Sequence, residues 1–539
     1  MNALRLIYAA GLLLFIALPL LLPLRELIQP GAWSWTEDDI ARLRGLSWNT
    51  LQLCAGTITI ALPIGTALAV LMFRTSFLAR RVCLFLNALL LFVPLPVIVS
   101  SWQGMFGADG WLPLEWLRGS DVRPWTTGMG PAIWIHAVSA IPWAAFIVGQ
   151  GLAWVEPELE EHAGQLAGPW RTLALVTLPR VRASIMAAAL FVVLQTAGEI
   201  SVTDMMLVST LAEETHTQFT AGDNAALART MLIFMPMLLA VWAAVMVAIW
   251  RIEGGLPSLT PPTREARPLE LGTSWLRPIV AIVLLAVLCA PLVSLIWKLG
   301  LTGQPRHWEL GVAEHYLRAE ATLLGRDLIF TLIIALLTGI FVATQALIVG
   351  WLARDSVWFR WFAFGVLTWA WVMPGPIVGI DLHELIMQIV RVFPDGVADA
   401  VLYRGPSPVP LMWVQTIRVL PIAVVFLWPV VRMIPRELIE EARLAGAGPI
   451  GMLLHVVAPS TWRAVAITAI AAGALCLAEV GATTRVETPG WESFTKLIFD
   501  RMHYGVDQNL AAVSVLMLAS LLVLTAIVAA IGWIARLRA

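Results

Sequence analysis

The sequence has little charge. Asp, Glu, Lys and Arg make up only 13% of its 539 residues, about half the share found in a typical soluble domain. The net charge of −1 provides no overall attraction to nucleic acid. Hydrophobic residues account for 59% of the chain. These values exclude an ordinary soluble protein and a nucleic-acid-binding protein, and they favour a protein that resides in a lipid bilayer.

The sequence also lacks the signatures of a catalytic or metal-binding protein. Its four cysteines lie far apart in apolar stretches, without the spacing of a metal or redox motif. No Gly-rich phosphate loop of the Walker type occurs, so the chain is not expected to hydrolyse ATP itself. We therefore expect a protein that is not an enzyme, with no catalytic residues, no cofactor and no metal site.

Long stretches without any Asp, Glu, Lys or Arg identify the fold class. A helix needs about 20 apolar residues to cross a bilayer, and continuous rather than alternating hydrophobicity favours helices over a barrel. The uncharged stretches are 48–73, 83–108, 124–155, 278–297, 328–353 and 509–535. Shorter or interrupted candidates lie at 4–24, 183–206, 231–250, 361–380, 409–431 and 464–479. The sequence therefore predicts an all-α polytopic membrane protein with about twelve transmembrane helices. We interpret the first as a retained anchor rather than a signal peptide.

A repeat runs through the chain with an offset of 280 residues, which slips to 279 where Trp134 and Pro142 match Trp413 and Pro421. The matched residues, each pair 280 positions apart, are Pro94 and Pro374, Glu160 and Glu440, Glu161 and Glu441, Gly168–Pro169 and Gly448–Pro449, Pro179 and Pro459, and Glu199 and Glu479. Residues 251–277, rich in Gly, Pro and charge, have the composition of a linker. The sequence therefore predicts a first half at 1–250, a cytoplasmic linker at 251–277 and a second half at 278–539. With about six spans each, both halves enter the membrane in the same direction, as two parallel repeats.

The most polar matched segments are the loops at 156–179 and 435–459. Each begins with acidic residues near a proline, continues through Ala and Leu positions to Gly-Pro, and ends at a further proline. This pattern is typical of a short amphipathic helix outside the bilayer that is followed by a return into it. An ordinary interfacial helix with solvated acids is the alternative interpretation.

These loops resemble the Glu-Ala-Ala…Gly…Pro signature of the permease components of binding-protein-dependent, ATP-binding-cassette (ABC) importers. The second copy fits through Glu440, Glu441, Ala442, Gly446 and Pro459, whereas the first has His162 in place of Ala and Leu166 in place of Gly. The resemblance implies that each loop is a coupling helix that docks on an ATPase subunit. The docking residues that it implies are Glu160, Glu161, Ala163, Gly168, Pro169, Glu440, Glu441, Ala442, Gly446, Gly448 and Pro449.

The resemblance also implies partners and a location. It is strongest to fused double permeases such as those of ferric-iron and thiamine importers. It implies two ATP-binding-cassette ATPase subunits, an extracytoplasmic solute-binding protein and alternating access across a bacterial inner membrane. The segment 479–505 favours iron(III) as the solute, with thiamine, polyamine and phosphonate solutes as alternatives. Basic residues at 74–81 and 536–538 favour cytoplasmic termini.

Four further residues are candidates for the translocation path. Glu199 and Glu479 are ionisable groups near the ends of apolar spans, where such groups face a cavity or a partner, although a structural role is the alternative. Pro94 and Pro374 interrupt spans and act either as gating hinges or as fixed kinks. We expect the stretch 381–391 to form an outer amphipathic helix rather than a metal site.

Two rivals from other classes remain at this stage. An ion-coupled secondary transporter with two parallel six-helix halves needs no ATPase, but it is expected to carry more ionisable residues in mid-membrane. A membrane assembly scaffold has no solute path. Co-purification with an ATPase, or solute-stimulated ATP hydrolysis, distinguishes the importer from both.

Overall fold

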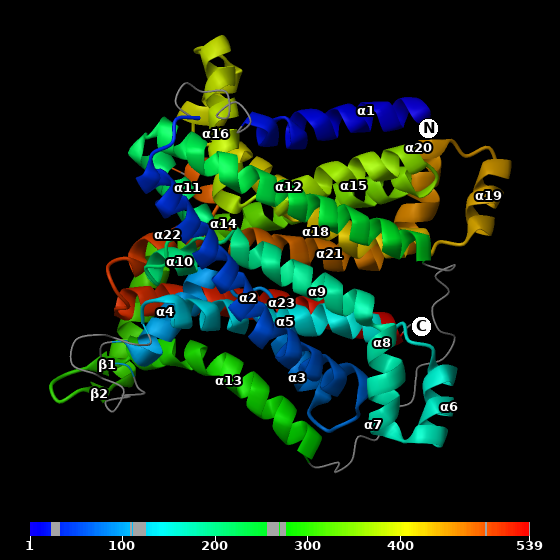
Figure 1. The fold of residues 1–539 in the computed structure, drawn as a ribbon, viewed down its shortest axis with the longest axis horizontal. Coiled ribbons are helices and arrows are strands. Elements are labelled where there is room, and N and C mark those ends of the chain that lie inside the picture. Colours follow the sequence, from blue (N-terminus) through cyan, green and yellow to red (C-terminus); the bar gives the residue numbers. More distant parts are fainter. Residues whose placement is uncertain are drawn as a thin grey trace.

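The computed structural model describes residues 1–22, 33–107, 110, 126–255, 269, 276–490 and 493–537. Within these residues the chain is helical almost throughout, with one two-stranded hairpin. Most helices run side by side along the longest axis of the molecule (Figure 1). The all-α prediction is confirmed.

Up to residue 255 the described elements belong to the expected first half. They are α1 (Asn2–Leu12), the π-helical turn η1 (Leu13–Ala17), α2 (Glu37–Arg74), α3 (Arg80–Leu90), α4 (Leu95–Phe106), α5 (Met129–Leu152), α6 (Pro157–Ala167), α7 (Pro169–Thr172), the π-helical turn η4 (Leu173–Thr177), α8 (Leu178–Arg180), α9 (Arg182–Ala197), α10 (Ser201–Met205), α11 (Leu211–Ala221) and α12 (Asn224–Gly255).

From residue 276 the described elements belong to the expected second half. They are α13 (Leu276–Leu299), β1 (Leu301–Thr302), β2 (His307–Trp308), α14 (Leu310–Arg354), α15 (Val357–Val372), α16 (Gly375–Val392), α17 (Val397–Asp399), the π-helical turn η5 (Ala400–Arg404), α18 (Val409–Arg432), α19 (Arg436–Leu444), α20 (Pro449–Met452), the π-helical turn η6 (Leu453–Val457), α21 (Ala458–Ala478), the 3₁₀ turn η7 (Thr483–Arg485), α22 (Phe494–Met502) and α23 (Gln508–Leu537). Strands β1 and β2 pair antiparallel, with Leu301 opposite Trp308.

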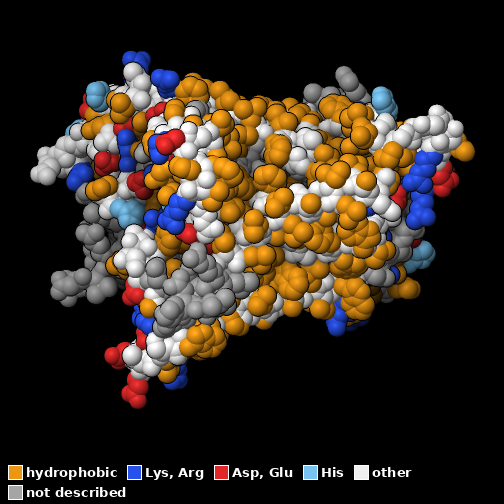
Figure 2. Space-filling view, turned by 90° about the horizontal axis from the view of Figure 1, so that it is seen from above, with side chains coloured by type: hydrophobic (Ala, Val, Ile, Leu, Met, Phe, Trp, Pro, Cys, Tyr) orange, Lys and Arg blue, Asp and Glu red, His pale blue; other side chains and the backbone are white. Residues whose placement is uncertain are grey.

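The helices have a multi-pass membrane character. Eight helical segments of the described chain are long and apolar enough to cross a membrane, and the number rises to eleven if each of three bent pairs counts as one span. The segment Asn2–Ala17, which overlaps the first expected span at 4–24, is a shorter apolar helix. Apolar side chains cover the middle of the face in Figure 2, whereas charged side chains gather at its two ends. This distribution is typical of a protein whose middle contacts lipid.

The two halves pack with matching sets of contacts. Helices α2, α5 and α9 pack on one another, and α14, α18 and α21 do the same. Small residues allow close approach: Gly65 lies against Ala144, and Gly339 has no room for a Cβ beside the backbone of α21. Helices of each half also pack on helices of the other half. Helix α12 packs on α15 and α23 packs on α3, while α11 packs on α16 and α22 packs on α4.

Prolines at matched positions break two helices rather than kink them. The axes of α3 and α4 differ by 106°, and those of α15 and α16 by 107°. Pro94 and Pro374 precede α4 and α16 in extended conformation, with ψ of 143° at both. The residue in front of Pro96 or Pro376 then begins the new helix, because proline is compatible with the first helical turn. Each pair is therefore a broken span or a re-entrant segment.

The expected linker and the expected outer helix can be placed in part. Helix α12 continues to Gly255 and α13 begins at Leu276, and most of 251–277 lies outside the described residues. Leu269 is buried, and its backbone N–H donates to the Arg74 carbonyl at 2.8 Å. The stretch 381–391 forms the later part of α16, which lies across the ends of the long helices (Figure 1).

Candidate functional site

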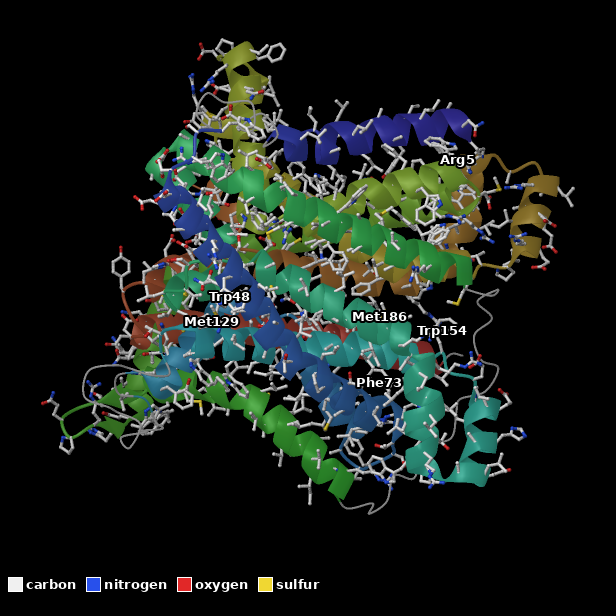
Figure 3. The ribbon with its side chains drawn as sticks, in the orientation of Figure 1. Arg5, Trp48, Phe73, Met129, Trp154 and Met186 are labelled. Atoms are coloured by element: carbon white, nitrogen blue, oxygen red, sulfur yellow. The ribbon has the colours of Figure 1, made fainter. Side chains whose placement is uncertain are left out.

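Both polar loops lie at the same end of the molecule. The first loop (156–179) carries α6 and α7, and the second loop (435–459) carries α19 and α20; all four helices lie at the right of Figure 1. We call this the loop end. Helix α1 begins there and α23 ends there (Figure 1). The side chains of Phe73 and Trp154 lie toward this end, and those of Trp48 and Met129 lie toward the opposite, far end (Figure 3).

Glycine and proline explain the shapes of the two loops. Gly168 adopts a φ of 76°, which ends α6, and Pro169 then occupies the first turn of α7. In the second loop Gly446 takes the left-handed conformation, with a φ of 82°, so α19 ends at Leu444. The first loop has Leu166 at the position that matches Gly446, and α6 continues to Ala167. The departure from the motif therefore makes α6 longer than α19.

A π-helical turn follows each loop helix at the same offset. Turn η4 spans Leu173–Thr177 and η6 spans Leu453–Val457. Pro179 and Pro459 come two residues after these turns. Because proline lacks an N–H and its ring clashes with the carbonyl four residues earlier, a wider turn accommodates it. Matched prolines thus produce the same local structure in both halves.

A buried ion pair anchors the first loop. Glu160 on α6 is 3% exposed and pairs with Arg74, which is 6% exposed at the end of α2. The hydroxyl of Thr177 donates to the Glu160 carboxylate at 2.6 Å. Glu160 therefore faces α2 and η4 rather than solvent. It holds α6 against the membrane-spanning helices instead of offering a charge to a partner.

The second loop is held by more exposed contacts. Arg354, the counterpart of Arg74, donates to the carbonyls of Val431 at 3.4 Å and Ile434 at 2.6 Å. Arg443 on α19 pairs with Asp355 at 3.3 Å, and their side chains are 51% and 41% exposed. Glu440 and Glu441 are exposed. These two acids of the motif remain accessible, unlike Glu160.

Large apolar side chains are exposed on both loops. Leu166 and Leu444 are each 89% exposed, Trp170 is 63% exposed and its counterpart Ile450 is 61% exposed. The remaining predicted docking positions lie near them. Glu161, Ala163, Gly168, Pro169, Ala442 and Pro449 are half-buried, and Gly446 and Gly448 are exposed. The loop end thus has apolar surface that a partner protein can cover.

Glu199 and Glu479 meet in one cavity between the two halves. This central chamber has a volume of about 160 Å³, and its walls include Trp143, Phe191, Trp371, Arg418 and the two glutamates. Several wall residues form pairs 280 positions apart, among them Gln195 and Leu475, Gly198 and Ala478, and Ile200 and Val480. Pro94 and Pro374 are not in the wall, but Leu95 and Gly375, which follow them, are. Two of the four predicted path residues, Glu199 and Glu479, therefore line the chamber, and the other two, Pro94 and Pro374, immediately precede residues of its wall.

Arg418 is a chamber residue that the sequence interpretation did not single out. Its Nε lies 3.3 Å from the Glu479 carboxylate, and it donates to the Met373 carbonyl at 2.6 Å. Glu479 also accepts from the Ala482 N–H at 3.0 Å. A signal for Arg418 existed, because it is the one charge inside the apolar stretch 409–431. A charge in such a stretch usually has a partner or a function.

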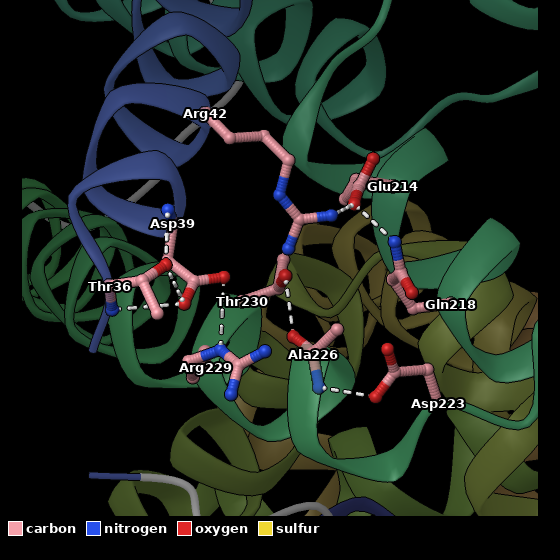
Figure 4. Close-up of polar contacts among 9 residues, drawn as sticks. All are labelled: Thr36, Asp39, Arg42, Glu214, Gln218, Asp223, Ala226, Arg229 and Thr230. Atoms are coloured by element: carbon pink, nitrogen blue, oxygen red, sulfur yellow. Dashed lines mark hydrogen bonds and ion pairs between the residues drawn. The ribbon is translucent and has the colours of Figure 1, made fainter. Parts of the chain in front are cut away.

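Polar contacts between the halves occur at the far end. The His503 imidazole lies 2.9 Å from Asp204, and Arg485 lies 2.7 Å from the His216 imidazole. Asp204 and His216 belong to the first half, whereas Arg485 and His503 belong to the second. Within the first half, Arg42 pairs with Glu214, and Arg229 pairs with Asp39 at 3.3 Å (Figure 4). Among the described residues no group of three His, Cys, Asp or Glu could hold a metal ion.

Comparison with known families and curated proteins finds no relative of this chain. The chain matches no protein-family model, and no curated protein matches it. Its function has to be argued from its own residues.

Proposed function

We propose that this chain is the membrane permease subunit of an ABC importer, built from two parallel six-helix repeats. The observation that carries the proposal is the placement of both motif-bearing loops at one end, each with large exposed apolar side chains. A protein that docks two ATPase subunits needs two such surfaces facing the same compartment. On this proposal the loop end is cytosolic, and the membrane is the bacterial inner membrane.

The matched packing of the halves supports the repeat. Both contain a triangle of three long helices, a helix pair broken by more than 100°, and a π-helical turn behind the loop. Reciprocal contacts between the halves are the pattern of a two-fold interface. The central chamber lies at that interface, where alternating access would pass a solute. An extracytoplasmic binding protein would deliver the solute to the far end.

The loops also offer a route for coupling. Glu160 joins α6 to α2 and η4. A displacement of the first loop would therefore be transmitted to the long helix α2 through a buried ion pair. Helix α2 packs on α5 and α9, and residues of α5 and α9 line the chamber. Closure of the ATPase subunits would thus be transmitted through contiguous contacts to the solute path.

The rival is an ion-coupled secondary transporter with two parallel halves. It uses no ATPase, so it gives no reason for exposed Leu, Ile and Trp side chains on both loops. For the importer, iron(III) is the first solute to test because the resemblance favours it. Uptake assays with iron(III) are therefore the starting point for identifying the solute.

The experiment that tests this function is co-purification of the chain with ABC ATPase subunits from the cells that produce it. We expect two ATPase subunits for each chain. Replacing both exposed acids, Glu440→Lys with Glu441→Lys, should release the ATPase and abolish uptake while leaving the protein in the membrane. The matched control is Glu314→Lys, a half-exposed acid at the start of α14. Full uptake by the double variant, or uptake that persists without ATP, would count against the importer.

A further inference from the structure

The central chamber is small. Its volume of about 160 Å³ is well below the ~300 Å³ at which pockets for drug-sized ligands begin. The chamber therefore suits a small ion or molecule that passes between the two halves. The chemistry of its walls identifies which kind.

The chamber wall contains more acidic than basic side chains. Glu199 and Glu479 both contribute to the wall, and Arg418 is paired with Glu479. The repeat offset in this helix is 279, as Trp134 and Trp413 show, so the residue of the first half that matches Arg418 is Ser139, a wall residue that has no charge. The duplicated unit therefore supplies two carboxylates but only one guanidinium.

Glu199 is held by neutral groups. Its carboxylate accepts hydrogen bonds from the backbone N–H groups of Ser201 at 2.6 Å and Val202 at 2.9 Å. The nearest basic side chain with a described contact is His136, whose Nε2 lies 4.0 Å away and which is 2% exposed. Backbone N–H groups orient a carboxylate but carry no full charge. The wall thus keeps one acidic group without a guanidinium or ammonium partner among the described contacts.

Aromatic rings from both halves form a continuous wall beside the glutamates. Trp143 and Phe191 are stacked with ring centroids 4.7 Å apart, and Phe191 lies 5.6 Å from Trp371. Aromatic faces attract organic cations and accommodate their apolar surface. They do not supply the oxygen or nitrogen ligands that a metal ion needs, and the described residues contain no three-ligand metal group.

We propose that the central chamber binds a small organic monocation, whose charge is held by Glu199 and whose flat or methylated body lies against Trp143, Phe191 and Trp371. The inference rests on the proposed function for the direction of transport, and it assigns that passage a solute class other than the iron(III) that the sequence resemblance favours. Ser139, in place of a second arginine, leaves Glu199 available for the cation.

The test is direct binding to the purified full-length chain in lipid nanodiscs. The probes are 1-methylnicotinamide, an aromatic monocation, and nicotinamide, which has nearly the same shape and no charge. We expect the cation to bind at least about tenfold more tightly, which is the scale of one interaction with a charged group. Glu199→Gln should remove this preference.

Two further variants separate charge from packing. Ser139→Arg supplies the missing guanidinium and should weaken binding of 1-methylnicotinamide at least about tenfold, whereas Ser139→Met, a neutral change of similar length, should leave the preference for the cation in place. Equal binding of the two probes, no binding of the cation, or unchanged binding in either Glu199→Gln or Ser139→Arg would overturn the proposal. So would tight, saturable binding of iron(III) citrate that Glu199→Gln abolishes. Retention of the ATPase by all these variants keeps the importer function separate from this outcome.

Discussion

The first and second loops carry the same motif and anchor it in different ways. In the first loop Glu160 is buried against Arg74 and Thr177, whereas in the second loop the matching Glu440 is exposed. Arg354, which matches Arg74, is directed instead to the carbonyls at the end of α18. A repeated sequence motif therefore does not guarantee a repeated set of contacts. The first loop is joined firmly to the membrane helices, and the second presents its acids to the solvent.

The largest expected effect comes from breaking the buried pair. Arg74→Met leaves Glu160 buried without its cation, and we expect this to lower the free energy of unfolding by about 3–5 kcal/mol. The matched change in the other half, Arg354→Met, removes hydrogen bonds to two carbonyls and should cost about 1–3 kcal/mol. Thermal unfolding of the two purified variants measures the difference.

A double variant tests whether the unpaired buried charge causes the loss of stability. When Glu160→Met is added to Arg74→Met, no unpaired charge remains buried, so part of the lost stability should return. Equal losses in Arg74→Met and Arg354→Met, or no recovery in the double variant, would show that the two loops are anchored with similar strength.

The next largest effect concerns how each loop meets its ATPase. Trp170 and Ile450 occupy matching positions with nearly equal exposure, 63% and 61%. Because Trp is the more effective anchor in protein interfaces, Trp170→Ala should weaken ATPase binding by about 2 kcal/mol and Ile450→Ala by less. Titration of the purified ATPase onto the variants in nanodiscs measures both. Val397→Ala, an 81% exposed apolar residue outside the two loops, is the control and should change nothing.

The sequence was sufficient for the fold class and for the positions of the loops because long uncharged stretches and a nearly constant repeat offset are direct signals. They predicted an all-α membrane protein and the positions of the loops. These signals could not predict the orientation of Glu160, because the motif does not reveal that Arg74, more than eighty residues earlier, lies beside it. The breaks at Pro94 and Pro374 were expected as kinks, because a sequence shows where a helical hydrogen bond is lost but not how far the chain then turns. Arg418 was not predicted because its matching residue is Ser139, so the repeat gives no paired charge at this position.

The smallest expected effect is a dependence on pH at the far end, where the halves again differ. Burial lowers the pKa of His503, but its hydrogen bond to Asp204 and the nearby charges of Asp204 and Asp500 outweigh burial, so the pKa is raised. Burial and the charge of Arg485 lower the pKa of His216 to about 4. His216 is therefore neutral over the range in which His503 titrates. Of the two histidine contacts between the halves, only the one between Asp204 and His503 should therefore change its charge between about pH 5 and pH 9.

The direction of the pKa shift of His503 determines whether its contact stabilises the protein more at low or at high pH. A raised pKa means that the folded protein holds the proton more tightly, so the pair stabilises the protein fully below the ordinary histidine pKa of about 6.5. This contribution is lost as the pH rises through the raised value. Both side chains are about two-fifths exposed, so after solvent screening the contribution should not exceed about 1 kcal/mol. The measurement is the unfolding temperature of the wild type minus that of His503→Gln across the pH range. The difference should shrink as the pH rises, whereas for His216→Gln it should stay constant; a difference that grows with pH would contradict a protonated His503.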